Sequence, residues 1–257
     1  MKPLIFITND DSISAPGLHH LIKIASRLGQ VIAVAPQLPQ SGQSSAITVD
    51  APLRINEVRG DGDARIFTVS GTPVDCVKLG LHAITPRKPD LILSGINHGS
   101  NSGNAILYSG TMGAVLEGCT VGIPSVGFSL CNHSLNADFS MALPFIDAIT
   151  RNVLEYGLPP QTALNVNIPG RTAPRGVRVC RAAQGHWSEQ YERMMDPHGK
   201  PFYWLTGRFV NEEKEAVDTD EYWLAQSYIS VVPVMPDQTA FSKISEFSSR
   251  FDSQAGI

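Results

Sequence analysis

Leu4-Ile5-Phe6-Ile7-Thr8-Asn9-Asp10-Asp11-Ser12, close to the N-terminus, joins an uninterrupted apolar run to a cluster of polar side chains. Such a run is typical of a strand that is buried on both faces of a parallel sheet. Asp10 and Asp11 would point to opposite faces along a regular strand, but a chain that turns at the strand's end can direct both toward one point. The segment therefore predicts a buried first strand that ends in two neighbouring carboxylates.

The paired carboxylates suggest a metal site. Two carboxylates that share a site repel each other, and each tends to hold a proton unless a cation lies between them. A hard divalent cation with oxygen ligands suits that position. Because Asn, Asp and Ser also favour turns and helix caps, a simple turn is the second interpretation of Asn9 to Ser12.

The composition is that of an ordinary globular protein of 257 residues, of which 42% are hydrophobic and 17% charged. The formal net charge of -4 argues against a nucleic-acid polymer as a partner. No apolar run approaches the ~20 residues that cross a bilayer, so no membrane partner is expected. The cysteines lack the short spacings of a zinc or redox site, which predicts reduced thiols and a cytoplasmic protein. They are Cys76, Cys119, Cys131 and Cys180.

The first half of the chain alternates apolar runs with segments of helical periodicity. We expect strands at residues 4–7, 31–35, 66–69, 91–93 and 125–130, and helices at 18–28, 74–84 and 112–119. This alternation predicts an α/β fold with a doubly wound, mostly parallel, Rossmann-like sheet. Ligands bind such sheets beyond the carboxyl ends of the strands, which would bring distant polar residues to one rim. Those residues are Asp10, Asp11, Ser41 and Asn97.

The remainder of the chain is less regular. A helix at 138–156 and an alternating strand at 164–169 are followed by two aromatic-rich alternating stretches, 186–195 and 202–209. The turn residues Asp196-Pro197-His198-Gly199 between them predict a long, extended β-hairpin. Thr219-Asp220 is a predicted helix cap, and 228–232 a further strand. We therefore expect a core at residues 1–180, a β-hairpin arm at 181–218, and a C-terminal strand and tail at 219–257 that complete the core.

Three polar loops accompany the aspartate pair. Ser41-Gly42-Gln43-Ser44-Ser45 offers hydroxyl and backbone N–H groups, and residues 94–103 combine glycines with asparagine amides. Residues 108–114 bring hydroxyls and free N–H groups to the start of a helix, which is a favourable anion site. The chain lacks the glycine-rich dinucleotide fingerprint, the P-loop motif and the nucleophile elbow of serine hydrolases. The pattern indicates phosphate and metal binding without those motifs.

Taken together, the motifs resemble the signature of the survival protein E (SurE) family, in the family's order and over most of the chain. The segments that carry the resemblance are 8–11, 41–44 with 47–48, 71–77, 94–103, 108–111 with 117–118, 164–169, 219–220 and 230–233. Met112, Val232 and Val234 depart from the family's usual residues, and none of them lies at the expected site. The resemblance implies a SurE-like fold and a metal-dependent 5'-nucleotidase that hydrolyses nucleoside 5'- and 3'-monophosphates, with short polyphosphate as a second substrate.

The resemblance also implies roles for individual residues. One divalent ion, Mg²⁺ or Mn²⁺, would be bound by Asp10, Asp11, Ser41 and Asn97. The phosphate would contact Asn9, Gly42, Asn101, Ser109, Gly110 and Thr111. From the arrangement of the site itself, we expect Asp10 and Asp11 to be catalytic, with one of the two carboxylates, Asp10 in preference to Asp11, accepting the proton of the attacking water. An isolated aromatic ribbon is marginal in water, so we expect the arm to pack against or be exchanged with a second subunit, as the resemblance also implies, giving a homodimer or tetramer. The alternative is that the arm folds back onto its own domain.

Some alternatives stay open at this point. A glycosidase would use Asp10 and Asp11 as acid and base, but adjacent residues would struggle to reach the ~5 Å or greater separation that a sugar requires. A non-catalytic metal- and nucleotide-binding regulator would use the same site without hydrolysis. His98 lies inside the 94–103 loop, yet it occupies a freely varying position of the motif, so we interpret it as a bystander.

Overall fold

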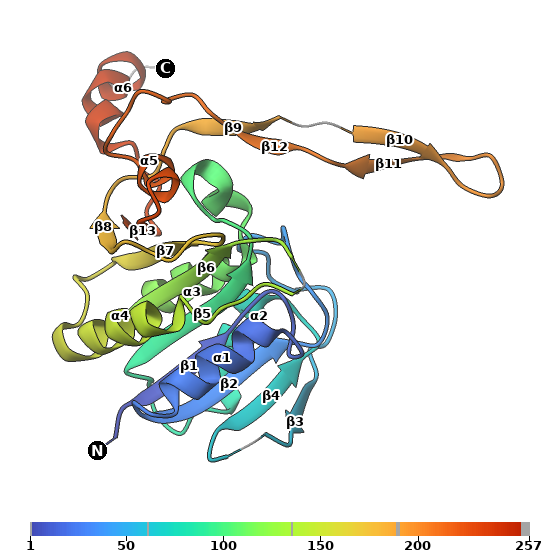
Figure 1. The fold of residues 1–257 in the computed structure, drawn as a ribbon, viewed down its shortest axis with the longest axis vertical. Helices are drawn as coiled ribbons and strands as arrows, with labels where there is room; N and C mark the ends of the chain where they lie inside the picture. The colour runs from blue at the N-terminus through green and yellow to red at the C-terminus, as the bar shows by residue number, and fades with distance from the viewer. Residues whose placement is uncertain (1, 61, 135, 189–190, 253–257) are drawn as a thin grey trace.

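The computed structural model describes residues 2–60, 62–134, 136–188 and 191–252, and it confirms the α/β fold (Figure 1). Nine strands form one sheet in the order β3-β4-β2-β1-β5-β6-β7-β13-β8. Their bounds are β1 Leu4–Thr8, β2 Gln30–Pro36, β3 Ile55–Val58, β4 Arg65–Val69, β5 Leu91–His98, β6 Ser125–Cys131, β7 Ala163–Pro169, β8 Val177–Val179 and β13 Ile229–Val234. The helices are α1 Pro16–Ala25, α2 Pro73–Ala83, α3 Gly110–Thr120, α4 Leu143–Tyr156, α5 Asp220–Ala225 and α6 Ile244–Phe251, with short 3-10 turns η1 Gly103–Tyr108 and η2 Phe241–Lys243.

The strand order creates a switch point between β1 and β5. From β1 the chain winds outward through β2 to β4, and from β5 it winds the other way through β6 to β7, all in parallel. At the margins, β3 pairs antiparallel with β4, and β13 pairs antiparallel with β7. Crevices at such switch points are where open α/β sheets bind ligands.

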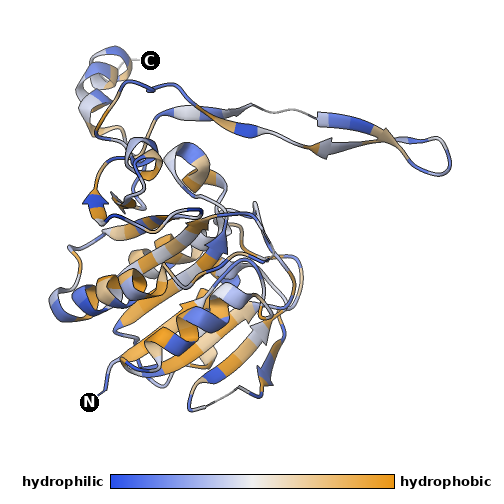
Figure 2. Ribbon diagram, viewed as in Figure 1, coloured by the Kyte–Doolittle hydropathy of each residue, from blue (hydrophilic) through white to orange (hydrophobic). Residues whose placement is uncertain are grey.

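The central strands are buried on both faces, which explains their uninterrupted apolar runs. Successive side chains of a strand point to opposite faces, so Ile5 and Ile7 pack with α1 and α4 in one cluster. Leu4 and Phe6 pack on the other side, in a second cluster with residues of α2. Figure 2 shows the hydrophobic residues concentrated in these strands. Within the described ranges, no helix has the length and apolar character needed to cross a membrane.

The arm consists of two consecutive strand pairs that extend away from the sheet (Figure 1). Gly185–Ser188 (β9) pairs antiparallel with Arg208–Asn211 (β12), and Tyr191–Met195 (β10) pairs antiparallel with Pro201–Leu205 (β11). At the tip, Gly199 has a φ of +74° and its N–H donates to the carbonyl of Asp196 at 3.0 Å. The structure thus has the extended hairpin that the sequence predicts, although residues 189–190, inside its first predicted stretch, lie outside the described residues.

The structure differs from the sequence-based expectations in several elements, among them helix α6, which was not predicted, and helix α1, which ends at Ala25 and not at residue 28. The short edge strands β3 and β8 were not predicted, because Ile55–Val58 is mostly exposed and shows no buried alternation. Helix α4 begins at Leu143, five residues after the expected start at residue 138. The fourth predicted strand continues past residue 93 to His98, so the polar residues of this segment belong to the strand itself.

Candidate active site

Asp10 and Asp11 follow directly after β1, at the carboxyl edge of the sheet. Asp10 is 4% exposed, and the hydroxyl of Thr111 donates to its Oδ1 atom at 2.5 Å. Burial, and next the charge of Asp11, raise the pKa of Asp10 to about 6. Both effects disfavour the ionised form of Asp10 when no cation is bound. The turn therefore holds the crowded carboxylate pair that the sequence suggests.

The first turn of α3 lies against Asp10. A side-chain carbon added at Gly110 would lie 2.8 Å from the Cβ atom of Asp10, so only glycine permits this approach. Ser109 caps the helix by accepting a hydrogen bond from the N–H of Met112 at 3.0 Å. The first N–H groups of a helix have no acceptor within it, and the helix dipole favours an anion there. The structure thus places Ser109, Gly110 and Thr111 where a phosphate could bind next to the carboxylates.

Asn97 reaches the same edge from β5. The pairing of β5 with β6 shifts in register between Ser94 and Asn97, and such bulges redirect side chains. The amide nitrogen of Asn97 donates to the carbonyl of Gly99 at 3.0 Å, which leaves its oxygen available as a ligand. The N–H of His98, the next residue, donates to Oδ2 of Asp11 at 3.0 Å. Asn97 and Asp11 therefore lie on neighbouring, directly bonded segments.

Ser41 and Gly42 lie on an exposed loop that is fastened at both sides of the rim. The N–H of Gln40 donates to the carbonyl of Asp10 at 2.7 Å. The Ser44 side chain donates to the carbonyl of Leu107 at 2.7 Å, just before α3. The loop therefore spans the space between the aspartate turn and the start of α3, with Ser41 next to the residue bonded to Asp10.

Asp75 on α2 anchors the far end of this loop, a role that the sequence did not reveal. Its carboxylate accepts hydrogen bonds from the hydroxyl of Thr48 at 2.6 Å and from the Thr48 N–H at 3.0 Å. It also accepts the N–H of Thr72 at 2.9 Å, completing a capping box at the start of α2. Burial alone would raise the pKa of Asp75, but these hydrogen bonds outweigh it and lower that pKa.

Asn9 and Asn101 are both buried, with different partners. The amide nitrogen of Asn9 donates to the carbonyl of Ser12 at 2.8 Å, whereas its Oδ1 is buried without a hydrogen-bond partner in the described part of the chain. The amide nitrogen of Asn101 donates to Ser129 at 2.7 Å, and its N–H donates to the side chain of Asn167 at 2.8 Å. Asn101 is thus built into a buried amide network that supports the 97–103 loop.

The C-terminal part of the chain completes this support. Asp220, at the start of α5, accepts the N–H of Gly103 at 2.8 Å, and Glu221 pairs with the hydroxyl of Ser102. Burial raises the pKa of both carboxyl groups. Thr219 caps α5 as predicted, accepting the N–H of Tyr222 at 3.2 Å. The contacts of Asp220 and Glu221 with the loop were missed, because a cap motif contains no information about distant partners.

The oxygen donors at this rim fit a hard divalent cation. Within the described ranges, no three His, Cys, Asp or Glu side chains gather as they would around an ion bound by such residues alone. A cation between Asp10 and Asp11 would therefore complete its shell with other oxygens, for which the amide of Asn97 and the hydroxyl of Ser41 are available. Carboxylate, amide and hydroxyl oxygens are the ligands that Mg²⁺ and Mn²⁺ accept.

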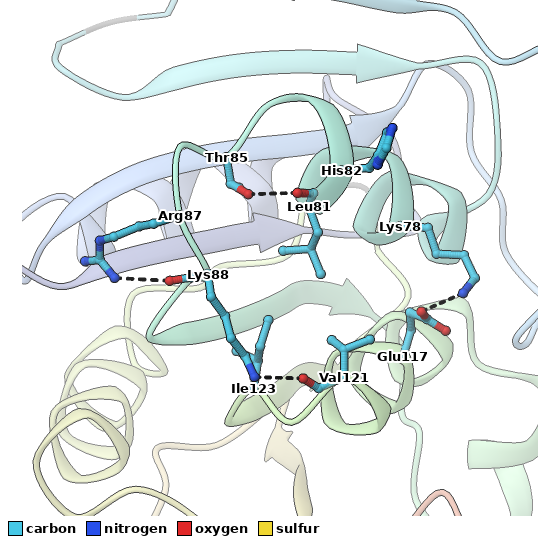
Figure 3. Close-up of a pocket in the computed structure, with 9 residues that line it drawn as sticks. All are labelled: Lys78, Leu81, His82, Thr85, Arg87, Lys88, Glu117, Val121 and Ile123. Atoms are coloured by element: carbon cyan, nitrogen blue, oxygen red, sulfur yellow. Dashed lines mark hydrogen bonds and ion pairs between the residues drawn. The ribbon is translucent and has the colours of Figure 1, made fainter.

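A separate depression of about 640 Å³ lies at the opposite edge of the sheet, between the ends of α2 and α3 (Figure 3). Lys78 donates to Glu117 at 2.7 Å, and Lys88 donates to the carbonyl of Val121 at 2.9 Å. These ammonium groups are thus paired within the chain, and none of the predicted site residues lines the depression. The rim around Asp10 is the better candidate for an active site.

Comparisons with known proteins identify the family. The family model described as "Survival protein SurE" matches residues 5–189. The chain is 47% identical over 248 residues to a protein of Phocaeicola vulgatus named 5'-nucleotidase SurE, covering 96% of each chain. It is 49% identical over 252 residues to a protein of the same name from Christiangramia forsetii, again covering 96% of each. The crystal structure of the SurE protein from Aquifex aeolicus superposes with a TM-score of 0.80 at 36% identity, covering 96% of this chain and 99% of that one. The chain belongs to the survival protein SurE family.

Proposed function

We propose that this protein is a metal-dependent 5'-nucleotidase that hydrolyses the phosphomonoester of nucleoside 5'- and 3'-monophosphates, with short polyphosphate as a second substrate. The observation that carries the proposal is the buried contact of Asp10 with the first turn of α3, which joins a carboxylate pair to a helix N-terminus. The names of the relatives support the reaction class, because the proteins of Phocaeicola vulgatus and Christiangramia forsetii are both called 5'-nucleotidases.

In this proposal, Asp10, Asp11, Ser41 and Asn97 would hold one divalent ion, either Mg²⁺ or Mn²⁺. When bound, the ion would act as a Lewis acid that neutralises charge on the phosphoryl oxygens. Asp10 and Asp11 bring the two negative charges, and the hydrogen bonds of Thr111 and His98 hold one oxygen of each carboxylate. Ser41 lies on the exposed loop, so of the four metal ligands it would be the one nearest to the solvent from which a substrate enters.

The phosphate would lie at the N-terminus of α3, with Ser109, Gly110 and Thr111 beneath it. Backbone N–H groups at a helix start stabilise an anion without having to reorganise during the reaction. Asn9 and Gly42 would contact the phosphate from the aspartate turn and from the exposed loop. For Asn101, the bonds to Ser129 and Asn167 favour a role in holding the loop through which it reaches the site.

Asp10 is the carboxylate to which we assign the proton of the attacking water. It lies between the metal-binding set and the start of α3, since it contacts Thr111 and Gly110. One oxygen of Asp11 instead accepts a hydrogen bond from the N–H of His98, at the end of β5. A group that accepts the proton must lie within hydrogen-bond reach of the water next to the phosphate, and Asp10 meets that condition more directly.

The test of the proposed function is the release of inorganic phosphate from nucleoside 5'- and 3'-monophosphates and from a generic aryl phosphate, with Mn²⁺ or with EDTA. The proposal predicts release with Mn²⁺ and none with EDTA. A regulator without catalytic activity would bind the nucleotide and release no phosphate under either condition. A glycosidase would cleave an aryl glycoside and leave the aryl phosphate intact.

We further propose that the protein is a homodimer, or a dimer of dimers, assembled through the arm. The strands β10 and β11 are exposed along their whole length, and the side chains of Tyr203 and Trp204 are 60% and 64% exposed. An isolated two-stranded ribbon is marginal in water, and a second subunit would cover its aromatic side chains. In this assignment residues 1–180 and 219–257 form the core, and 181–218 form the arm.

A cytoplasmic location is part of the same proposal. Cys76, Cys119, Cys131 and Cys180 are free thiols in the structure. Burial raises the pKa of Cys76 and of Cys131 above the usual thiol range, which makes both thiols poor nucleophiles. Reduced, unreactive cysteines suit a reducing compartment.

A further inference from the structure

His98, the last residue of β5, contacts Asp11 twice. Its backbone N–H donates to Oδ2 of Asp11 at 3.0 Å, and its ring nitrogen Nδ1 lies 3.3 Å from the same oxygen. Neither contact uses Oδ1 of Asp11. The imidazole therefore fixes one carboxylate oxygen and leaves the other oxygen available to a ligand.

The two ring nitrogens of His98 have different surroundings. The ring packs edge-on against Phe139, with 5.2 Å between ring centroids and 90° between the planes. Its Nε2 atom is buried without a hydrogen-bond partner in the described part of the chain. A proton on Nδ1 allows that nitrogen to donate to Asp11 and leaves a lone pair, and no unpaired N–H, on Nε2. A hydrogen bond from Nδ1 to Asp11 thus favours the tautomer of the ring in which Nε2 has no proton.

We propose that His98 is a positioning residue for Asp11, which orients the carboxylate so that Oδ1 binds the divalent cation. This inference rests on the metal site of the proposed function. Thr111 has the corresponding role for Asp10, because the hydroxyl of Thr111 donates a hydrogen bond to Oδ1 of Asp10 at 2.5 Å. Each aspartate is therefore held by one side chain from a different segment. Hydrogen bonds to metal-binding carboxylates are the contacts that tune the affinity of a metal site.

Two substitutions separate the hydrogen bond from the packing of the ring. His98→Phe keeps an aromatic ring against Phe139 but removes the side-chain donor, whereas His98→Asn removes the ring and keeps a side-chain N–H donor at the δ position. The backbone N–H that donates to Asp11 is present in both variants, so the comparison isolates the contribution of the side chain. His20→Phe is the matched control, because the His20 ring also packs on Phe139, with 5.3 Å between centroids, and has no contact with Asp11. The readout is Mn²⁺ binding to metal-free protein, measured by calorimetry without substrate.

We expect His98→Phe to weaken Mn²⁺ binding by roughly 10- to 100-fold, the usual effect of removing a partner of a metal ligand. His98→Asn should bind Mn²⁺ close to the wild-type affinity, and His20→Phe should be unchanged. Rescue by Asn distinguishes positioning from packing, because a purely structural role of the ring would not be restored by a smaller amide. Thermal unfolding of each variant verifies that it is folded, and His98→Ala replaces His98→Phe if the latter does not fold.

The inference is overturned if His98→Phe binds Mn²⁺ like the wild type, or if His98→Asn is weakened as much as His98→Phe. Asp11→Asn serves as the reference for the site itself. If the wild type and Asp11→Asn bind Mn²⁺ equally, the proposed metal site is wrong and the inference falls with it. If Asp11→Asn loses binding while His98→Phe keeps it, only the role of His98 is wrong and the proposed function stands.

Discussion

The rim around Asp10 and the hairpin arm follow opposite rules of burial. At the rim, polar side chains are buried: Asp10 is 4% exposed and Thr111 is fully buried. On the arm, large apolar side chains are exposed, with Trp204 at 64%. Proteins normally place these groups the other way round, since buried polar groups and large exposed apolar patches both cost free energy.

The two regions differ in what completes them. The rim satisfies most of its polar groups within one chain, through hydrogen bonds from Thr111, His98 and the residues of α5, and the groups that remain suit a small ligand. Within the described residues, the outer strands β10 and β11 pair in a sheet only with each other, and we propose that a second subunit covers their apolar faces. We therefore expect changes at the rim to affect chemistry without affecting assembly, and changes in the arm to do the reverse.

Replacing Asp10 or Asp11 by Asn should reduce metal-dependent phosphate release by on the order of 10²- to 10³-fold, comparable with the loss of one group that stabilises the transition state. The metal-free fold should be kept or slightly stabilised, because one of two repelling carboxylates is removed. Asp50→Asn, which changes an exposed carboxylate outside the rim, is the control. Near-normal turnover of Asp10→Asn with Mn²⁺ present would contradict the assigned site.

Excising residues 188–207 and bridging the gap with a Gly-Ser turn should convert the proposed dimer into a monomer, because the exposed aromatic faces of β10 and β11 are lost. Asp10, Asp11, Ser41 and Asn97 should keep their places, so Mn²⁺ binding should persist. Sedimentation at micromolar concentration measures the assembly. A full-length chain that sediments as a monomer would show that the arm does not assemble the protein.

The metal-free protein should become less stable as the pH rises from about 4 to 7, relative to Asp10→Asn. The folded state holds the pKa of Asp10 at about 6, above its ordinary value of 3.8. The stability that the protonated Asp10 contributes is therefore complete below the pKa of Asp10 in the unfolded chain. It is lost as the pH rises through the higher pKa that Asp10 has in the folded protein. The expected difference in the free energy of unfolding is on the order of 2 kcal/mol.

Denaturant unfolding in EDTA at several pH values, for the wild type and Asp10→Asn, measures this difference. The arm-excised protein should show the same pH dependence as the full-length chain, since the arm does not contain the group that titrates. If the difference in unfolding free energy between the wild type and Asp10→Asn stayed constant from pH 4 to pH 7, burial would not disfavour the ionised form of Asp10.

Thr111→Val should weaken Mn²⁺ binding by about 10-fold, because it removes the hydroxyl that holds Oδ1 of Asp10. Thr111→Ser keeps the hydroxyl and should bind Mn²⁺ nearly as the wild type does. If Thr111 contacted only the phosphate, the affinity for Mn²⁺ would be unchanged in Thr111→Val. Calorimetry with Mn²⁺, and separately with inorganic phosphate, decides between the two roles.

Much of the fold was predictable because the physical signal is local. The run from Leu4 to Ile7 is apolar without interruption, as a strand covered on both faces requires, and the same holds for Val31 to Ala35. The alternating aromatic stretches on either side of the turn at Asp196 predict the arm for a similar reason. By contrast, β3 and β8 are largely exposed strands at the margins of the sheet, and their four and three residues are too few for a hydrophobic periodicity to be recognised.

Local sequence patterns were enough to predict that two carboxylates end the first strand, that further polar loops follow other strands, and that the sheet would gather them at one edge. The atoms that meet at that edge are known only from the folded chain. His98 and Asp11 are 87 residues apart, and Gly103 and Asp220 are 117 apart. Contacts of this kind depend on the register of β5 beside β1 and on the return of α5 to the loop, and neither leaves a pattern within a short segment. For this reason His98, a bystander by its place in the motif, became a residue with a defined partner only when the chain was folded.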